Sequence, residues 1–133
     1  MSSPVGFSED SLDALQHMQD RREINTVILR YAAASDDLVA EVEGNLTHEE
    51  LLGALPANEP RLVVYELSFA SPDGARKNEK MLIFWDPPGA IGRKQPYADG
   101  YAALLQLLDT AHVHLKATQT AQLEHARLVT LAG

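Results

Sequence analysis

The residues best suited to chemistry by type and spacing lie in the segment DPPGAIGRK, Asp86 to Lys94. Glycines beside cations could cradle a phosphate. The P-loop pattern, however, places four residues between its glycines and continues with Gly-Lys-Ser/Thr. Gly89 and Gly92 enclose only two residues, and no hydroxyl follows Lys94. The spacing therefore excludes a P-loop, and it leaves Arg93 and Lys94 as basic loop residues in front of a leucine-rich stretch.

Histidines offer a second kind of chemistry, metal binding. His112 and His114 alternate along a β-like stretch, so their side chains would point to one face. Zinc sites use three or four protein ligands, and no third ligand stands at a suitable spacing. Three further histidines are scattered, and we expect them at the surface or at helix ends: His17, His48 and His125. We expect no metal and no cofactor.

Paired acids could serve as general acid and base. Carboxylates take that role when burial or a charged neighbour displaces a pKa. Asp36 with Asp37, and Glu49 with Glu50, instead stand where turn and helix-start residues belong. We therefore expect no catalytic residue. A small ligand-binding domain or enzyme stays open as an alternative, which a deep pocket containing a residue of displaced pKa would favour.

Length and composition bound the class of protein. The chain has 133 residues, which suits one domain, and no cysteine, which excludes disulfides, thiolate zinc sites and cysteine nucleophiles. No apolar run approaches the roughly 18 residues of a membrane-spanning helix. The start MSSPVGFSED lacks the basic and apolar regions of a signal peptide. We expect a soluble, cytoplasmic protein.

Charge is unevenly distributed along the chain. The net charge of −8 argues against nucleic-acid binding, because phosphate contacts need clustered lysine and arginine. Residues 1–60 contain twelve acids and three arginines. Five cations then stand within nineteen residues: Arg76, Lys77, Lys80, Arg93 and Lys94. This asymmetry indicates either two electrostatically different faces or ordinary solvated charge.

Periodicity and capping predict the elements of the first half. A serine before two acids predicts a helix from about Glu9 to Arg22. The β-branched run INTVILRYAA, residues 24–33, predicts a strand that pairs with residues 38–44 around the turn Asp36-Asp37. A Thr-x-x-Glu capping box predicts a short helix from Thr47 to Leu55.

The second half predicts a further hairpin and helices. RLVVYELSF and KMLIFW, residues 61–69 and 80–85, should pair antiparallel through an SPDG turn and a ragged connection over residues 75–79. Asp99 should cap a long helix whose leucines repeat at helical spacing. A short strand and a final helix should follow, at residues 112–118 and 121–131.

Helices that occur between strand groups, rather than at one end, favour a sheet covered on both faces. We therefore predict an α/β fold with a central mixed β-sheet flanked by helices on both faces. No internal repeat or long linker divides the chain, so we expect a single domain over residues 1–133.

The chain resembles the actin-depolymerising factor (ADF)/cofilin family in three motifs, in the family's order. MSSPVGFSED and the following Leu12, Leu15 and Met18 are similar to the family's N-terminal extension and first helix. LPANEPRLVVYELSF is similar to its Leu-Pro-x-Asn-(Asp/Glu) segment and the next strand. MLIFWDPPGAIGRKQPYADGYAALLQLL is similar to its Phe-x-Trp-x-Pro strand end, basic loop and long helix. The resemblance implies an ADF-homology domain with a flexible extension over residues 1–7.

The resemblance also implies a function without catalysis, as a monomeric protein of the actin cytoskeleton that promotes filament disassembly or severing. In the family, the N-terminus, the basic loop and the start of the long helix contact monomeric actin. The matching residues, here called the monomer face, are Ser3, Arg93, Lys94, Gln95, Asp99 and Gly100. Ser3 also matches the family's phosphorylated serine, and a phosphate there would add about −1.5 to −2 charges and repel an acidic partner. Filament-specific contacts match a second group, here called the filament face: Arg76, Lys77, Lys80, Glu124 and Arg127.

The chain departs from the family along the long helix. Gln95-Pro96 replaces the usual Lys-Met, and Leu105 and Leu107 occupy positions that are often basic. The lysine-rich insertion that some members carry after the first helix is missing, so the resemblance implies neither nuclear import nor strong phosphoinositide binding, and weaker phosphoinositide binding stays open. A second hypothesis follows from the lost lysines. The protein could resemble glia maturation factor or coactosin, which bind the branched-actin nucleation complex or filament sides.

Overall fold

The computed structural model describes residues 6–20, 24–70, 73–88, 94–108 and 111–132. Within these residues, one mixed sheet contains β1 (Gly6–Phe7), β2 (Thr26–Ala32), β3 (Asp37–Gly44), β4 (Arg61–Ala70), β5 (Arg76–Trp85) and β6 (Ala111–Ala117). The order is β1-β3-β2-β4-β5-β6, with parallel pairing of β1 with β3 and of β5 with β6. The helices are α1 (Glu9–Asp20), α2 (His48–Ala54), α3 (Gln95–Leu107), α4 (His125–Ala132) and the 3-10 helix η1 (Thr120–Leu123).

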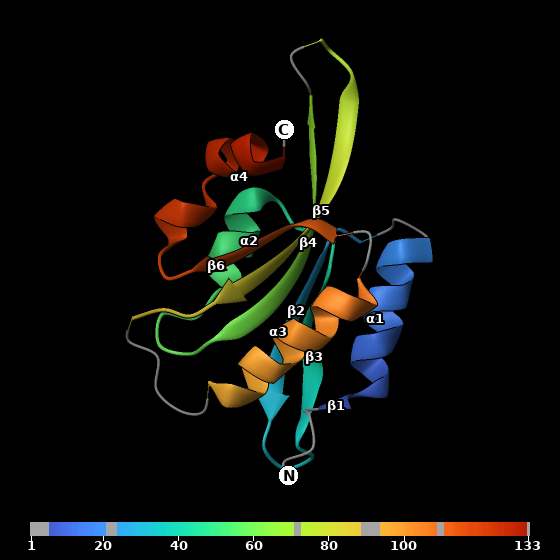
Figure 1. Cartoon of the computed structure of the whole chain (residues 1–133), viewed down its shortest axis with the longest axis vertical. Coiled ribbons are helices and arrows are strands. Elements are labelled where there is room, and N and C mark those ends of the chain that lie inside the picture. Colours follow the sequence, from blue (N-terminus) through green and yellow to red (C-terminus); the bar gives the residue numbers. More distant parts are fainter. Residues whose placement is uncertain (1–5, 21–23, 71–72, 89–93, 109–110, 133) are drawn as a thin grey trace.

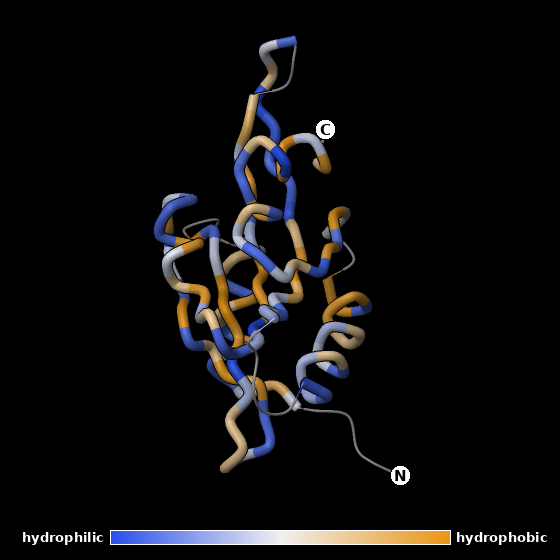
Figure 2. Tube along the Cα trace, turned by 90° about the vertical axis from the view of Figure 1, so that its left-hand side faces the viewer, coloured by the Kyte–Doolittle hydropathy of each residue, from blue (hydrophilic) through white to orange (hydrophobic). Residues whose placement is uncertain are grey.

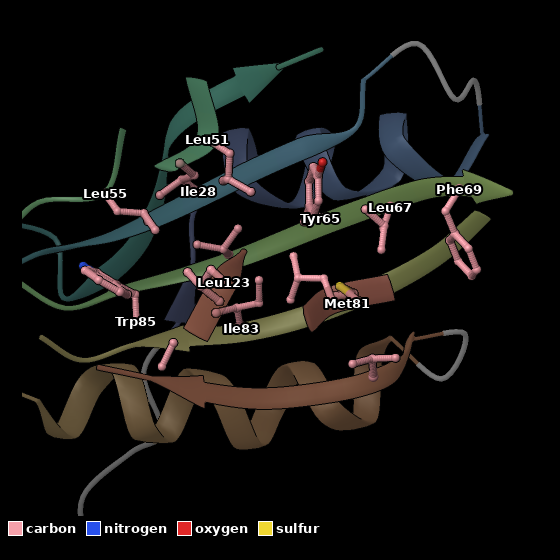
Figure 3. Packing of buried hydrophobic residues seen from close by; sticks show 14 residues of the cluster. Ile28, Leu51, Leu55, Tyr65, Leu67, Phe69, Met81, Ile83, Trp85 and Leu123 are labelled. Carbon is pink, nitrogen blue, oxygen red and sulfur yellow. The ribbon is translucent and has the colours of Figure 1, made fainter. Parts of the chain in front are cut away.

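Helices cover both faces of the sheet, which confirms the predicted α/β fold (Figure 1). α1 and α3 pack on one face, where Leu62 and Val64 of β4 belong to the first core cluster. α2 and α4 pack on the other face, where the alternate residues Val63 and Tyr65 belong to the second cluster (Figure 3). Because both faces are buried, the central strands are nearly continuous apolar runs. Figure 2 shows the hydropathy along the trace, with orange, hydrophobic stretches within the body of the molecule.

The N-terminal elements begin close to the predicted positions. The Ser11 amide donates to Ser8 Oγ at 3.1 Å at the start of α1. The Ser11 hydroxyl donates to the Leu38 carbonyl at 3.1 Å, so it joins α1 to β3. Gly6 and Phe7, which the resemblance assigned to the extension, form β1 alongside Asp37 and Leu38. The rest of that extension and the predicted helix end at Arg22 lie outside the described residues.

The capping box of α2 is confirmed. The Thr47 amide donates to Glu50 Oε1 at 2.8 Å, and the Glu50 amide donates to Thr47 Oγ1 at 3.1 Å. Beyond the helix, the Trp85 indole N–H donates to the Pro56 carbonyl at 2.7 Å. This hydrogen bond therefore connects the loop that leads into β4 with the end of β5.

The connection between β4 and β5 is more regular than predicted. The ragged stretch expected over residues 75–79 is wrong from Arg76 onward, because pairing continues from Arg61↔Trp85 to Ala70↔Arg76. β2 pairs with β4 only as far as Thr26↔Tyr65, and β6 meets β5 only from Lys80 onward. The outer part of the hairpin therefore projects beyond its neighbouring strands as a two-stranded ribbon (Figure 1).

The start of α3 is earlier than predicted. Asp99 is not its cap, because the helix begins at Gln95 and the Lys94 carbonyl accepts the Tyr97 and Ala98 amides at 3.0 Å. Pro96 lies in the first turn, where its missing N–H leaves no helical bond unmade. Proline thus opens this helix, which begins before the predicted cap Asp99.

The predicted final helix is divided in two. η1 covers Thr120–Leu123, and α4 begins only at His125. Glu124 separates them with an extended ψ of 144°, which a continuous helix excludes. The Gln122 side-chain oxygen accepts the amides of Thr118 and Gln119, at 2.6 and 3.1 Å, and so stabilises η1 as a separate turn.

Candidate functional site

The described part of the monomer face lies at the start of α3. Lys94 Nζ lies 3.2 Å from Asp86 Oδ1, so this cation is already paired within the chain. The Gln95 side-chain amide donates to Asp99 Oδ1 at 2.8 Å, one helical turn on. Gly100 is buried on the same stripe of α3 as Tyr97 and Leu104, so packing accounts for that position. Ser3 and Arg93 lie outside the described residues.

A hollow of about 320 Å³ lies beside the start of α3. Its lining comes from the ends of β5 and β6 and from α3: Phe84, Asp86, Lys94, Gln95, Ala98, Lys116 and Thr118. Lys116 Nζ lies 5.7 Å from the ring centre of Phe84 and 5.9 Å from that of Tyr101, which are cation–π distances. The sequence analysis missed Lys116, whose place in an alternating strand was its only signal.

The filament-face cations of the hairpin do not share one face. Side chains alternate along a strand, and directly paired residues lie on the same side. Lys77 pairs with Phe69, which is buried in the core cluster beneath α4. Arg76 and Lys80 therefore lie on the opposite side of the ribbon from Lys77.

The other filament-face residues lie at the beginning of α4. Glu124 and Arg127 are both exposed, Glu124 at the break before the helix and Arg127 in its first turn. Arg127 borders an apolar hollow of about 490 Å³ that is also lined by Leu115 and Leu131. Because α4 covers the face of the sheet to which Lys77 points, these residues and Lys77 occupy one side of the molecule.

His48 and His125, which the sequence analysis treated as scattered, meet in the structure. Their ring centres are 5.6 Å apart with an edge-to-face geometry, and the Tyr65 ring lies 6.3 Å from His48. Both ring nitrogens of His48 are buried, and within the described residues neither forms a hydrogen bond of good geometry. Burial lowers the pKa of His48, the Leu123 carbonyl partly opposes this effect, and the charge of His125 adds to the lowering.

Acidification should therefore weaken the fold through His48. The folded-state pKa is below the ordinary value of 6.5, so the unfolded chain binds the proton more readily. The contribution of neutral His48 to the free energy of unfolding is complete above pH 6.5, the ordinary pKa. It decreases as the pH falls from that value to the lowered pKa of the folded state. Melting temperatures at about pH 7.5 and about pH 5.5 measure the effect. His48→Phe keeps a ring against Tyr65 and should show the smaller difference. An equal pH dependence in both proteins would contradict this assignment.

Metal binding and membrane spanning are the two remaining possibilities that the described residues can be checked for. No group of three or more histidine, cysteine, aspartate or glutamate side chains there is arranged to hold a metal ion. His114 is exposed on β6, and the side chain of His112 lies outside the description. None of the described helices combines the length and apolar character that a bilayer crossing needs.

The fold is shared with proteins of known structure. Cofilin of Streptomyces griseoflavus matches with a TM-score of 0.82 at 19% identity, covering 96% of each chain. Coactosin from Entamoeba histolytica matches with a TM-score of 0.73 at 18% identity, covering 97% of this chain and 94% of coactosin. At such low identity these matches establish the fold alone.

Sequence comparison establishes the family. The model of the cofilin/tropomyosin-type actin-binding proteins matches residues 4–131. Actin-depolymerizing factor 2 of Oryza sativa subsp. japonica is 25% identical over 126 residues, which cover 92% of this chain and 87% of that protein. The chain therefore belongs to the ADF/cofilin family of actin-binding proteins, as the sequence motifs predicted.

Proposed function

We propose that this protein acts at the actin cytoskeleton, where it binds actin monomers and filaments and promotes filament disassembly. The family match over nearly the whole chain carries the proposal. The geometry supports it with two separate basic regions, one at the start of α3 and one formed by Lys77 of the projecting hairpin and Arg127 of α4. Binding energy rather than covalent chemistry would act here, because a ligand that prefers one filament geometry shifts the population toward it.

Two double charge reversals test the proposal. Arg93→Glu with Lys94→Glu should weaken binding to monomeric actin by at least about tenfold, equivalent to about 1.4 kcal/mol. Lys77→Glu with Arg127→Glu, the two cations that lie on the α4 side of the molecule, should weaken co-sedimentation with filaments more than monomer binding. The two variants carry the same change in net charge, so each controls for unspecific electrostatics in the other.

The measurements are co-sedimentation with filaments, fluorescence-monitored disassembly and titration of labelled monomers. Thermal unfolding of each variant must match that of the unmodified protein, so that a loss of binding reflects the changed charges and not a damaged fold. If the unmodified protein neither binds filaments nor accelerates their loss, the proposed function is wrong. If both double variants lose both activities equally, the division into two faces is wrong.

A coactosin-like activity is the second candidate, and the surface of α3 favours it. The first and last turns of α3 carry no acidic or basic residue, and Leu107 is 55% exposed where many members have a cation. A protein of that kind would bind filament sides, or the branched-actin nucleation complex, without binding monomers tightly. Parallel pull-downs with monomeric actin and with that complex distinguish the two candidates.

A further inference from the structure

We propose that Asp86 restrains the monomer face by holding Lys94 in an internal ion pair, which a carboxylate of the actin monomer must replace. Asp86 would then set the affinity and the salt dependence of that face. The inference rests on the proposed function, and it adds a residue that the family resemblance does not assign. The sequence indicated Lys94 only as a basic residue of the loop, whereas the structure pairs it with Asp86.

The backbone holds Asp86 in place. It follows the last residue of β5, and its amide donates to the Ala117 carbonyl of β6 at 2.8 Å. Lys94 is anchored in turn by its carbonyl, which accepts the first amide bonds of α3. The ion pair of 3.2 Å between Lys94 Nζ and Asp86 Oδ1 therefore connects two residues whose backbones are held by hydrogen bonds.

Asp86 Oδ1, the atom paired with Lys94, is buried, and among the described residues it accepts no hydrogen bond of good geometry. The contact with Lys94 is thus one of charge rather than of a well-aligned hydrogen bond. The Lys94 side chain is 52% exposed, so water and an incoming partner can reach it. Pairs with this exposure are weak and exchange partners readily.

The hollow is already suited to a second carboxylate. Lys116 lines it as well as Lys94, so its described lining carries two ammonium groups and one carboxylate. A carboxylate of the partner would gain these donors, but it would lie close to Asp86 and be repelled by it. Removing the charge of Asp86 should therefore strengthen binding of an acidic partner.

If Asp86 orients Lys94 for binding instead of restraining it, the predicted effect of removing Asp86 is reversed. If Asp86 served to orient Lys94 for binding, its removal would loosen Lys94 and weaken the complex. Asp86→Asn separates the two roles, because asparagine keeps the shape of the side chain and removes its negative charge. Glu49→Gln on α2 is the matched control, since it makes the same charge change on the other face of the sheet.

Titration of labelled monomeric actin is the first measurement. We expect Asp86→Asn to bind about three- to fivefold more tightly than the unmodified protein at low salt, and the difference should shrink as salt screens the charges. Glu49→Gln should bind as the unmodified protein does. Unchanged or weaker binding by Asp86→Asn would overturn the proposal.

A second measurement needs no actin. Acetylation of surface lysines by an activated ester, followed by peptide mass spectrometry, reports how freely each ammonium group reacts. Lys94 should react about two- to fourfold faster in Asp86→Asn, with Lys80 as the internal reference. Equal rates would show that Asp86 does not hold Lys94 and would overturn the proposal by themselves. If Lys94 reacts faster but no protein binds actin, the proposed function fails while the restraint on Lys94 stands.

Discussion

Replacing Glu41 with alanine should lower the free energy of unfolding by about 3 kcal/mol, because it leaves a buried guanidinium without its main partner. Arg61 is only 5% exposed at the start of β4. Its Nε and Nη2 atoms donate to the two Glu41 oxygens at 3.1 Å each, the paired geometry that makes such contacts strong. Burial alone would lower the pKa of Arg61, but its bonds to Glu41 and Glu59 outweigh that effect and raise it.

A β-bulge explains why Glu41 can reach Arg61. Ile28 pairs with Val42 and Leu29 with Ala40, so Glu41 is the extra residue of β3. Bulges turn a side chain away from the regular alternation. Here the carboxylate spans the sheet from β3 to β4 and also lies 3.4 Å from Nε of Arg30 on β2, the strand between them.

Urea unfolding followed by circular dichroism measures the loss, and Glu59→Ala is the control. Glu59 also accepts from Arg61 Nη2, at 3.0 Å, but its side chain is 52% exposed. Exposed pairs contribute about 0–1 kcal/mol, so this variant should be far less destabilised. Comparable losses of unfolding free energy in the two variants would show that the contact of Glu41 with buried Arg61 stabilises the fold no more than the exposed contact of Glu59 does.

Leu104→Ala should lower the free energy of unfolding by about 2–5 kcal/mol, the usual cost of a cavity left by a buried leucine. Leu104 is fully buried on the inner side of α3 and belongs to the first core cluster with Tyr97 and Leu108. The cavity would also loosen the helix that carries Gln95 and Asp99. Binding of monomeric actin should therefore weaken more than binding to filament sides.

Leu107→Ala on the same helix is the matched control. Leu107 is 55% exposed, so its truncation removes the same atoms without opening a cavity, and the change should stay within about 0.5 kcal/mol. Thermal and urea unfolding of the two variants measure the contrast. Similar destabilisation by both would mean that Leu107 is covered in solution, for instance by a second copy of the chain.

Local patterns predicted the elements wherever one residue decides the conformation. The capping box at Thr47 and Glu50 fixes the start of α2 through bonds within three residues. The Asp36 turn is formed as expected, with that residue at a positive φ of 56° that aspartate tolerates. The start of α3 was predicted wrongly because Asp99 has good capping chemistry, yet proline at the first turn was the stronger signal.

The candidate site could be predicted only in part. The basic residues of the loop and hairpin were identified from their types and from the family motifs. The partner of Lys94, the ring contacts of Lys116 and the meeting of His48 with His125 join residues that are remote in sequence or on different elements. No local pattern encodes such contacts, because they depend on the packing of helices on the sheet.

By itself, the sequence determined the class of fold, the order of the elements and the family, because periodicity, caps and motif order are local properties of the chain. The tertiary structure alone decided which charges act together. Strand pairing set Lys77 apart from Arg76 and Lys80, and the bulge aimed Glu41 at Arg61. Packing of α3 beside the end of β5 brought Lys94 to Asp86. The electrostatic character of each surface depends on distances between residues that are remote in sequence. Those distances are set only when the strands pair and the helices pack on the sheet.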